Sequence, residues 1–238
     1  MNKVLAAEFY KLKHSKILFT VWIGAFLPAL LYTIANLFSE DRLIWDLWFG
    51  DQFSVLLIFS PPLFAIITGF IVGSEYQHKT INSLFTYPYS RFHFLAGKMI
   101  VAVTFIFMTC ILAFAANIVT GLIFVEASLS LEDTVTYLIA YLVIALMITS
   151  VVPLWMFVSI LGKSYTPAIV ISLVISTLPG PIGGSTAYGE IVQFVLRIAG
   201  RGEPIDLFPV IVIFGSLFLV FLIIASTIYV KSDVHSGS

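Results

Sequence analysis

Six long apolar stretches dominate the sequence and constrain its fold more than any other feature. Each is long enough to cross the hydrocarbon core of a bilayer as a helix, which takes about 20 residues. A helix is the expected form because its backbone amides bond one another where no water is present. The predicted spans are residues 17–38, 53–74, 99–125, 137–161, 165–184 and 208–230.

The composition favours the same fold class. Of the 238 residues, 60% are hydrophobic and 11% are charged, whereas soluble domains carry about 25% charged residues. We therefore expect an all-α polytopic membrane protein with a single transmembrane domain over residues 1–238. Residues 1–16 are basic and weakly amphipathic, which favours an interfacial helix in the headgroup layer. The alternative is a basic tail that only sets the orientation of the chain.

The basic residues predict how the chain is oriented in the membrane. Nine of the 12 Lys and Arg residues fall on one side of the predicted spans, and Arg42, Arg197 and Arg201 fall on the other. Because basic residues accumulate on the cytoplasmic side, both termini and residues 75–98 are expected to be cytoplasmic. The nine residues are Lys3, Lys11, Lys13, Lys16, Lys79, Arg91, Lys98, Lys163 and Lys231.

The connection over residues 75–98 carries charged and aromatic side chains between two predicted spans. Its first part predicts a short helix from Lys79 to Phe85 that ends before Pro88. Ser90 can cap a second helix because its hydroxyl accepts a hydrogen bond from a free backbone amide. The connection is thus expected to be a compact helix–turn–helix element, and the alternative is a solvated loop that obeys the charge rule.

Polar and proline residues within the spans permit two interpretations each. Asn117 is expected either to bond a neighbouring helix or to line a substrate path. Pro61-Pro62 is expected to act as a hinge in its span, and a kink that only serves helix packing is the alternative. The outer residues Pro179, Gly180, Pro181, Gly183 and Gly184 predict an irregular turn, and the apolar stripe from Ile191 to Ile198 follows it.

Several activities find no support in the sequence. No ionisable residue lies near the middle of a predicted span, which disfavours an ion-coupled carrier. Gly162-Lys163-Ser164 has the tail of a phosphate-binding loop, but Phe157 occupies the place of its first glycine. The sequence also lacks a zinc-binding His pair, a serine-hydrolase elbow and a basic, aromatic surface for nucleic acid. The single cysteine, Cys110, is expected to be a buried hydrophobe.

The connection resembles the second cytoplasmic segment of permease subunits of the ABC-2 family of ABC transporters. The start of the chain, Glu8 to Lys13 before the first predicted span, is similar to that family as well. The matching positions are Gly73, Glu75, Thr80-Ile81, Leu84, Pro88, Ser90-Arg91 and Lys98.

This resemblance implies a permease without its own nucleotide site, coupled to a cytoplasmic ABC ATPase that binds ATP and Mg. It also implies a coupling helix that contacts the ATPase, and the sequence contains apolar anchors and charges suited to that role. The residues expected at this interface are Glu75, His78, Lys79, Thr80, Ile81, Leu84, Phe85, Pro88, Ser90 and Arg91.

The resemblance further implies a bacterial cell membrane location, a second permease copy (identical or a sibling) and contact with membrane lipid. It implies short re-entrant helices between spans five and six that form an outer gate, whereas an amphipathic helix on the outer leaflet is the alternative. Small permeases of this family are associated with peptide antibiotics, so an exported amphipathic or lipid-like substrate is expected. A membrane anchor or sensor, and an intramembrane lipid-modifying enzyme, are the competing functions.

Overall fold

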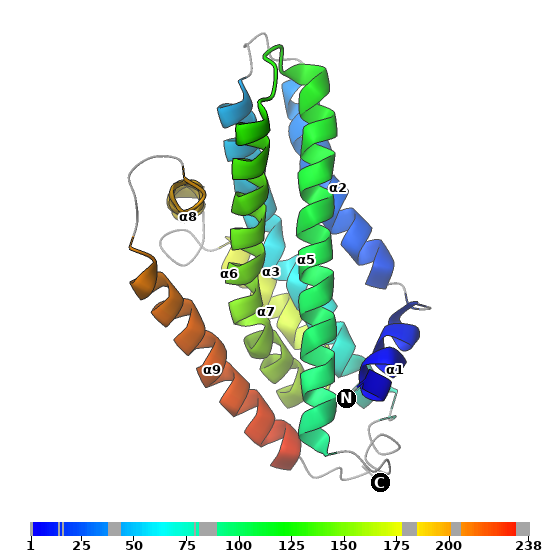
Figure 1. Ribbon diagram of the computed structural model, residues 1–238. Helices are drawn as coiled ribbons and strands as arrows, with labels where there is room; N and C mark the ends of the chain where they lie inside the picture. Colours follow the sequence, from blue (N-terminus) through cyan, green and yellow to red (C-terminus); the bar gives the residue numbers. More distant parts are fainter. Residues whose placement is uncertain are drawn as a thin grey trace.

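The computed structural model describes residues 2–13, 15, 17–37, 44–78, 80, 90–177, 185–200 and 206–231. Its helices confirm the predicted all-α class (Figure 1). They are α1 (Asn2–Lys13), α2 (Ile17–Asn36), α3 (Trp45–Gln77), α5 (Arg91–Phe124), α6 (Leu131–Leu161), α7 (Thr166–Thr177), α8 (Ser185–Ile198) and α9 (Leu207–Lys231).

Helix α3 forms the centre of the bundle, where it contacts α2, α5, α6, α7 and α8. Large side chains, among them Trp48, Phe49, Phe53 and Phe64, are fully buried along it. Helices α2 and α9 lie at the periphery and expose most of their apolar side chains. In a bilayer such exposed side chains face lipid or another protein, so they do not conflict with a folded protein.

Five helices are long and apolar enough to cross a membrane: α2, α3, α5, α6 and residues 208–230 of α9. Three of them begin six to eight residues before the spans predicted from the sequence: α3 at Trp45 instead of residue 53, α5 at Arg91 instead of residue 99, and α6 at Leu131 instead of residue 137. With 33 residues, α3 is about 50 Å long, which exceeds the roughly 30 Å of the hydrocarbon core. Its first turns therefore continue the helix beyond the apolar layer.

The predicted span over residues 165–184 appears as α7, a helix of 12 residues. Twelve residues rise about 18 Å, which is too short to cross the core alone. Residues 178–184 lie outside the described residues, so the span over residues 165–184, the fifth of the six, stays a prediction.

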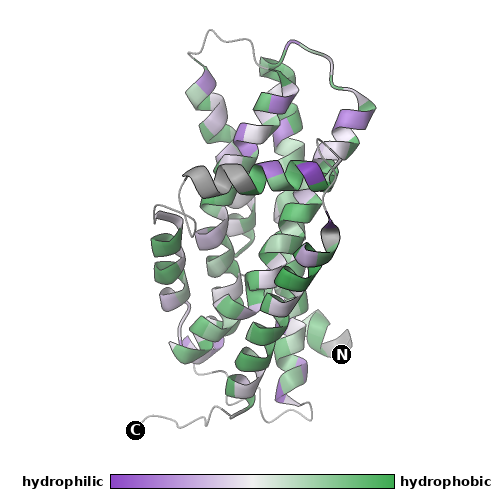
Figure 2. Cartoon of the chain, turned by 90° about the vertical axis from the view of Figure 1, so that its left-hand side faces the viewer, coloured by the Kyte–Doolittle hydropathy of each residue, from purple (hydrophilic) through white to green (hydrophobic). Residues whose placement is uncertain are grey.

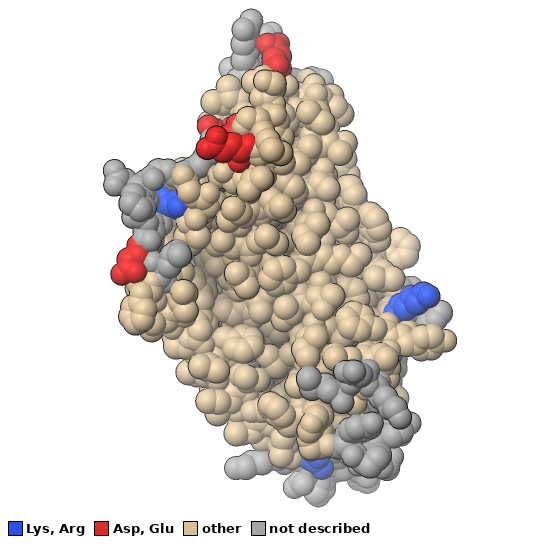
Figure 3. Space-filling model, in the orientation of Figure 1, with Lys and Arg blue, Asp and Glu red and all other residues tan. Residues whose placement is uncertain are grey.

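The start of α1 and the end of α9 lie at one end of the bundle, together with the end of α3, the start of α5 and the turn from α6 to α7 (Figure 1). Apolar residues cover the middle of the bundle (Figure 2). The acidic side chains visible in Figure 3 lie at the upper end and along the left side, with one basic side chain among them, and the other visible basic side chains lie in the lower half. This arrangement is the one expected for a multi-pass membrane protein.

Helix α3 runs through Pro61 and Pro62 without interruption. Pro61 has no amide to donate to the carbonyl of Leu57, but the Ser60 hydroxyl donates to that carbonyl at 3.0 Å. A side chain thus replaces the missing backbone bond, and the hinge expected here is not seen as a break in the helix.

Helix α8 lies across the bundle and packs on α3 and α6 (Figure 2). Val192, Val195 and Ala199 are buried, whereas Arg197 is exposed. The spacing of three and four residues places the apolar side chains on one helical face. The predicted apolar stripe therefore packs against protein.

Candidate functional site

A buried ion cluster joins α3 and α5. These two helices include both ends of the connection predicted over residues 75–98, and residues 78–90 lie between them. Lys98, in α5, donates from Nζ to Glu75 Oε1 of α3 at 2.6 Å and to the Ile71 carbonyl at 3.3 Å. The Lys98 side chain is fully buried and Glu75 is 1% exposed. Because an unpaired charge is very costly inside a protein, each of these two residues requires the other.

Helix α1 adds two further ion pairs to the same cluster. Its Glu8, 5% exposed, accepts a hydrogen bond from Lys98 Nζ at 3.0 Å. Its Lys11 donates from Nζ to Glu75 Oε1 at 2.6 Å, with a side chain that is 45% exposed. Glu75 Oε2 accepts no hydrogen bond from the described part of the chain. Three segments far apart in sequence therefore meet at one charged centre.

The two ends of the connection are fixed to the bundle by hydrogen bonds. The amide of Thr80 donates to the Glu75 carbonyl at 3.0 Å, which closes the end of α3. Ser90 accepts a hydrogen bond from the amide of His93 at the start of α5, which confirms the predicted cap. Arg91 donates from Nη1 to the Val230 carbonyl at 2.8 Å and so ties α5 to α9.

Helix α3 also packs closely against the turn between α6 and α7. A Cβ atom at Gly73 would lie 2.5 Å from the Tyr165 amide nitrogen and 2.7 Å from the Ser164 carbonyl carbon. Gln77 donates from Nε2 to Ser164 Oγ at 2.7 Å beside this contact. Glycine is therefore required at position 73 because any side chain would meet backbone atoms.

The structure changes the place of Glu75 in the predicted interface. From the sequence, Glu75 is expected among the side chains that contact the ATPase, but its carboxylate is buried under α1 and paired with two lysines. His78, Thr80 and Ser90 are exposed at the two ends of the connection, and Arg91 is partly exposed. Lys79, Ile81, Leu84, Phe85 and Pro88 lie outside the described residues.

Sequence reasoning missed Glu8 as a member of the site. The signal was a spacing of four residues, because Val4, Glu8 and Leu12 are the three buried side chains on one face of α1. A carboxylate on the apolar face of a basic helix indicates a cation on the element that covers it.

Asn117 lies in the core of the bundle, 2% exposed. The Nδ2 atom of its side chain donates a hydrogen bond to the hydroxyl of Tyr141 in α6. Its backbone carbonyl accepts a hydrogen bond from Trp48 Nε1 at 3.1 Å. This geometry supports the interhelical hydrogen bond, one of the two interpretations of Asn117. The expected gate residues Pro179, Gly180, Pro181, Gly183 and Gly184 lie outside the described residues.

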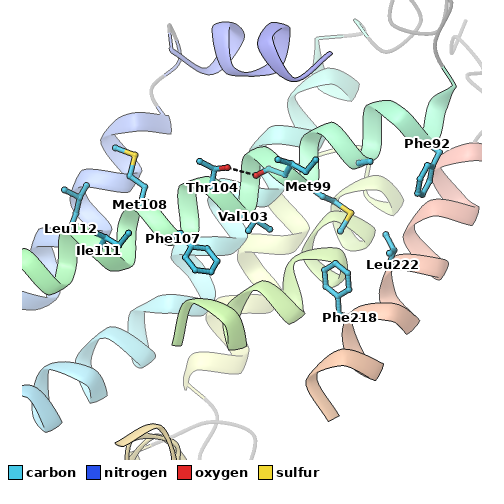
Figure 4. A pocket seen from close by; sticks show the side chains of 12 residues that line it. Phe92, Met99, Val103, Thr104, Phe107, Met108, Ile111, Leu112, Phe218 and Leu222 are labelled. Carbon is cyan, nitrogen blue, oxygen red and sulfur yellow. Dashed lines mark hydrogen bonds between the residues drawn. The ribbon is translucent and has the colours of Figure 1, made fainter. Parts of the chain in front are cut away.

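An apolar groove of about 900 Å³ runs between α5 and α9 (Figure 4). Its walls include Phe92, Met99, Phe107 and Phe218. The hydroxyl of Thr104, also in the lining, is bonded to the Ile100 carbonyl at 2.8 Å. The surface of the groove can therefore bind hydrocarbon but offers little to a polar group. No three metal-ligating side chains cluster among the described residues.

Apolar helices around a charged centre at one end define a multi-pass membrane protein. The family model of the ABC-2 family transporter proteins matches residues 4–179. The chain belongs to this family.

A relative with a more specific name is the bacitracin transport permease protein BCRB of Bacillus licheniformis. It is 26% identical to this chain over 137 residues. The match covers 54% of this chain and 64% of the relative, less than two thirds of its length. No solved structure matches the chain.

Proposed function

We propose that this chain is the permease subunit of an ATP-driven exporter in the bacterial cell membrane, and that a separate cytoplasmic ABC ATPase binds the connection between α3 and α5. The buried ion cluster at the base of that connection is the observation that carries the proposal. Family membership supports it. ATP and Mg bind to the ATPase, and this chain binds neither.

A rigid base allows a small movement of the soluble ATPase to be transmitted to the membrane-spanning helices. The connection leaves α3 beside Glu75 and enters α5 just before Lys98, and these two side chains are bonded to each other. A push on the connection therefore moves α3 and α5 together instead of bending one of them. Glu75 contributes by holding the base, while the side chains from Lys79 to Phe85 contact the ATPase.

The proposed substrate is an amphipathic peptide or lipid-like antibiotic. The apolar groove between α5 and α9 supports a substrate with a hydrocarbon portion, because its lining is suited to apolar contact. The name of the bacitracin permease relative supports a peptide antibiotic. A second permease copy, identical or a sibling, completes the transporter with a second ATPase.

The ATPase proposal is tested by purification from native membranes in mild detergent. The wild-type chain is expected to bring down an ABC ATPase in near-equal amount, identified by mass spectrometry and by labelling with azido-ATP. Ile81→Asp is expected to abolish this co-purification because it puts a charge among the predicted anchors. Leu131→Asp, at an exposed position at the start of α6, is the matched control and should retain the ATPase. Recovery of the wild-type chain alone would refute the proposed partner.

The substrate proposal is tested in cells that produce the permease with this ATPase. These cells are expected to survive higher bacitracin concentrations and to accumulate less labelled bacitracin than cells with an ATPase variant that cannot hydrolyse ATP. Equal accumulation in both strains would reject bacitracin, and a panel of other amphipathic peptides and lipids would follow. The ATPase assignment would stand in that case.

A further inference from the structure

Helix α1 meets the ion cluster with two residues of opposite charge, Glu8 and Lys11. We propose that α1 is a releasable latch, and that Glu8 and Lys11 are positioning residues that hold the Glu75–Lys98 pair and the base of the connection in one state. The regulatory role rests on the proposed function, whereas the release itself is a property of this chain alone.

The charges of the cluster divide into two neutral pairs. Glu8 and Lys11 belong to α1, and Glu75 and Lys98 belong to the bundle. When α1 leaves, the bond of 2.6 Å between Lys98 and Glu75 remains, so neither helix of the bundle retains an unpaired charge. Removal of one charged residue has a different effect, because it leaves the buried cluster with a net charge.

The charges of α1 can also satisfy each other after release. Glu8 and Lys11 are three residues apart on one helix, which is a spacing at which Glu and Lys side chains pair. In the docked state they bond Lys98 and Glu75 instead. Exchange of partners therefore accompanies both docking and release, and it lowers the electrostatic cost of the movement.

The apolar contact that seats α1 is small and rests on a glycine. Val4 Cγ1 lies 3.2 Å from the place that a Cβ atom would occupy at Gly97, the residue directly before Lys98. Val4 and Leu12 are buried, Leu5 is partly buried, and Phe9, 38% exposed, packs its ring on Phe105, whereas Tyr10 is 69% exposed. A helix held by few apolar side chains and by exchangeable ion pairs can undock without exposing a large core.

The first experiment measures thermal unfolding of the purified permease in detergent. Glu8→Gln is expected to lower the melting temperature most, since it leaves a buried excess of positive charge. Lys11→Gln should lower it less because Lys11 is partly exposed. The double variant should melt closer to wild type than Glu8→Gln does, and Lys13→Gln on the exposed side of α1 is the control. Additive losses in the double variant would overturn the neutral-pair argument.

The second experiment locks the latch in the permease–ATPase complex. Val4→Cys together with Gly97→Cys places two thiols in position for a disulfide, and the native Cys110 is buried. Cross-linking is expected to be efficient without nucleotide and about fivefold lower when ATP and vanadate trap the complex, a typical strength of coupling between sites. The locked protein should lose ATP-driven transport in proteoliposomes and regain it with a reductant.

The outcomes separate the latch from the proposed function. If the ATPase binds and the cross-linked protein transports as well as the reduced one, α1 is a fixed structural element and the latch is refuted. If no ATPase binds, the proposed function fails. The unfolding experiment still decides whether Glu8 and Lys11 can leave the cluster together as a neutral pair. Gly97→Ile should reproduce the loss of coupling without altering any charge, because the isoleucine side chain would occupy the space in which Val4 packs against α5.

Discussion

At the scale of single residues, Asn117 and Tyr141 illustrate how polar groups are accommodated inside the bundle. Each lies in a different helix, both are buried, and the side chain of one bonds that of the other. Such a pair joins α5 to α6 but presents no free polar surface to a substrate. Its expected role is therefore stability.

Tyr141→Phe tests this role. The substitution removes the hydroxyl that bonds the Asn117 amide, and the loss of a buried partner costs about 1–3 kcal/mol. We expect a lower melting temperature in detergent together with normal transport by the molecules that remain folded. Tyr165→Phe is the control, because the Tyr165 hydroxyl has no hydrogen bond among the described residues. A change in substrate preference with unchanged stability would contradict a packing role.

At the scale of elements, the contact between α3 and the α6–α7 turn depends on the absence of a side chain at Gly73. The neighbouring atoms belong to the backbone of Ser164 and Tyr165, which cannot rotate away as the end of a side chain can. The end of α3 that carries Glu75 is therefore positioned from two sides, by Lys98 and by this turn. Gly50, in the same helix, has no atom within 4 Å of its Cβ position.

Gly50 and Gly73 of α3 are expected to respond in opposite directions to alanine. Gly73→Ala should destabilise the protein by about 1–3 kcal/mol through overpacking. Gly50→Ala should be neutral or stabilise it by up to about 1 kcal/mol, because alanine favours a helix. Thermal unfolding of the two variants under the same detergent conditions compares them directly. Equal behaviour of both variants would mean that the turn moves freely away from α3.

At the scale of the whole molecule, the start of α1 and the end of α9 lie at the same end of the bundle, which fits an even number of crossings. The excess of basic residues predicts that this end is cytoplasmic. Because the native Cys110 is fully buried, it contributes little background to labelling with thiol reagents.

Labelling with a membrane-impermeant maleimide tests the orientation. Leu131→Cys, at the end opposite the termini and 82% exposed, should react in intact cells. Lys13→Cys, exposed on α1, should react only after the membrane is permeabilised. The reverse pattern would invert the predicted topology.

The sequence was sufficient for features that depend on local chemistry. Apolar stretches identified the long helices, and the serine hydroxyl identified the cap at Ser90. The start of α3 at Trp45 is not predicted from the sequence because Asp46, Asp51 and Gln52 interrupt the apolar run. Trp48 and Phe49 beside them are nevertheless buried. The bond between Glu8 and Lys98 joins residues 90 positions apart, so only the packing of α1 on α5 reveals it.

The uninterrupted course of α3 through Pro61 and Pro62 gives this helix the mechanics of a lever. A rod of about 50 Å that tilts by about 5° at one end shifts its other end by roughly 4 Å. Trp45 and Trp48 lie at that far end, against the carbonyls of Ala127 and Asn117. Because α3 and α5 move together, a small rotation beside Glu75 would carry both indoles and their partner carbonyls over this distance and change their surroundings at the far end. Tryptophan fluorescence would report, from one side of the membrane, a movement that begins on the other.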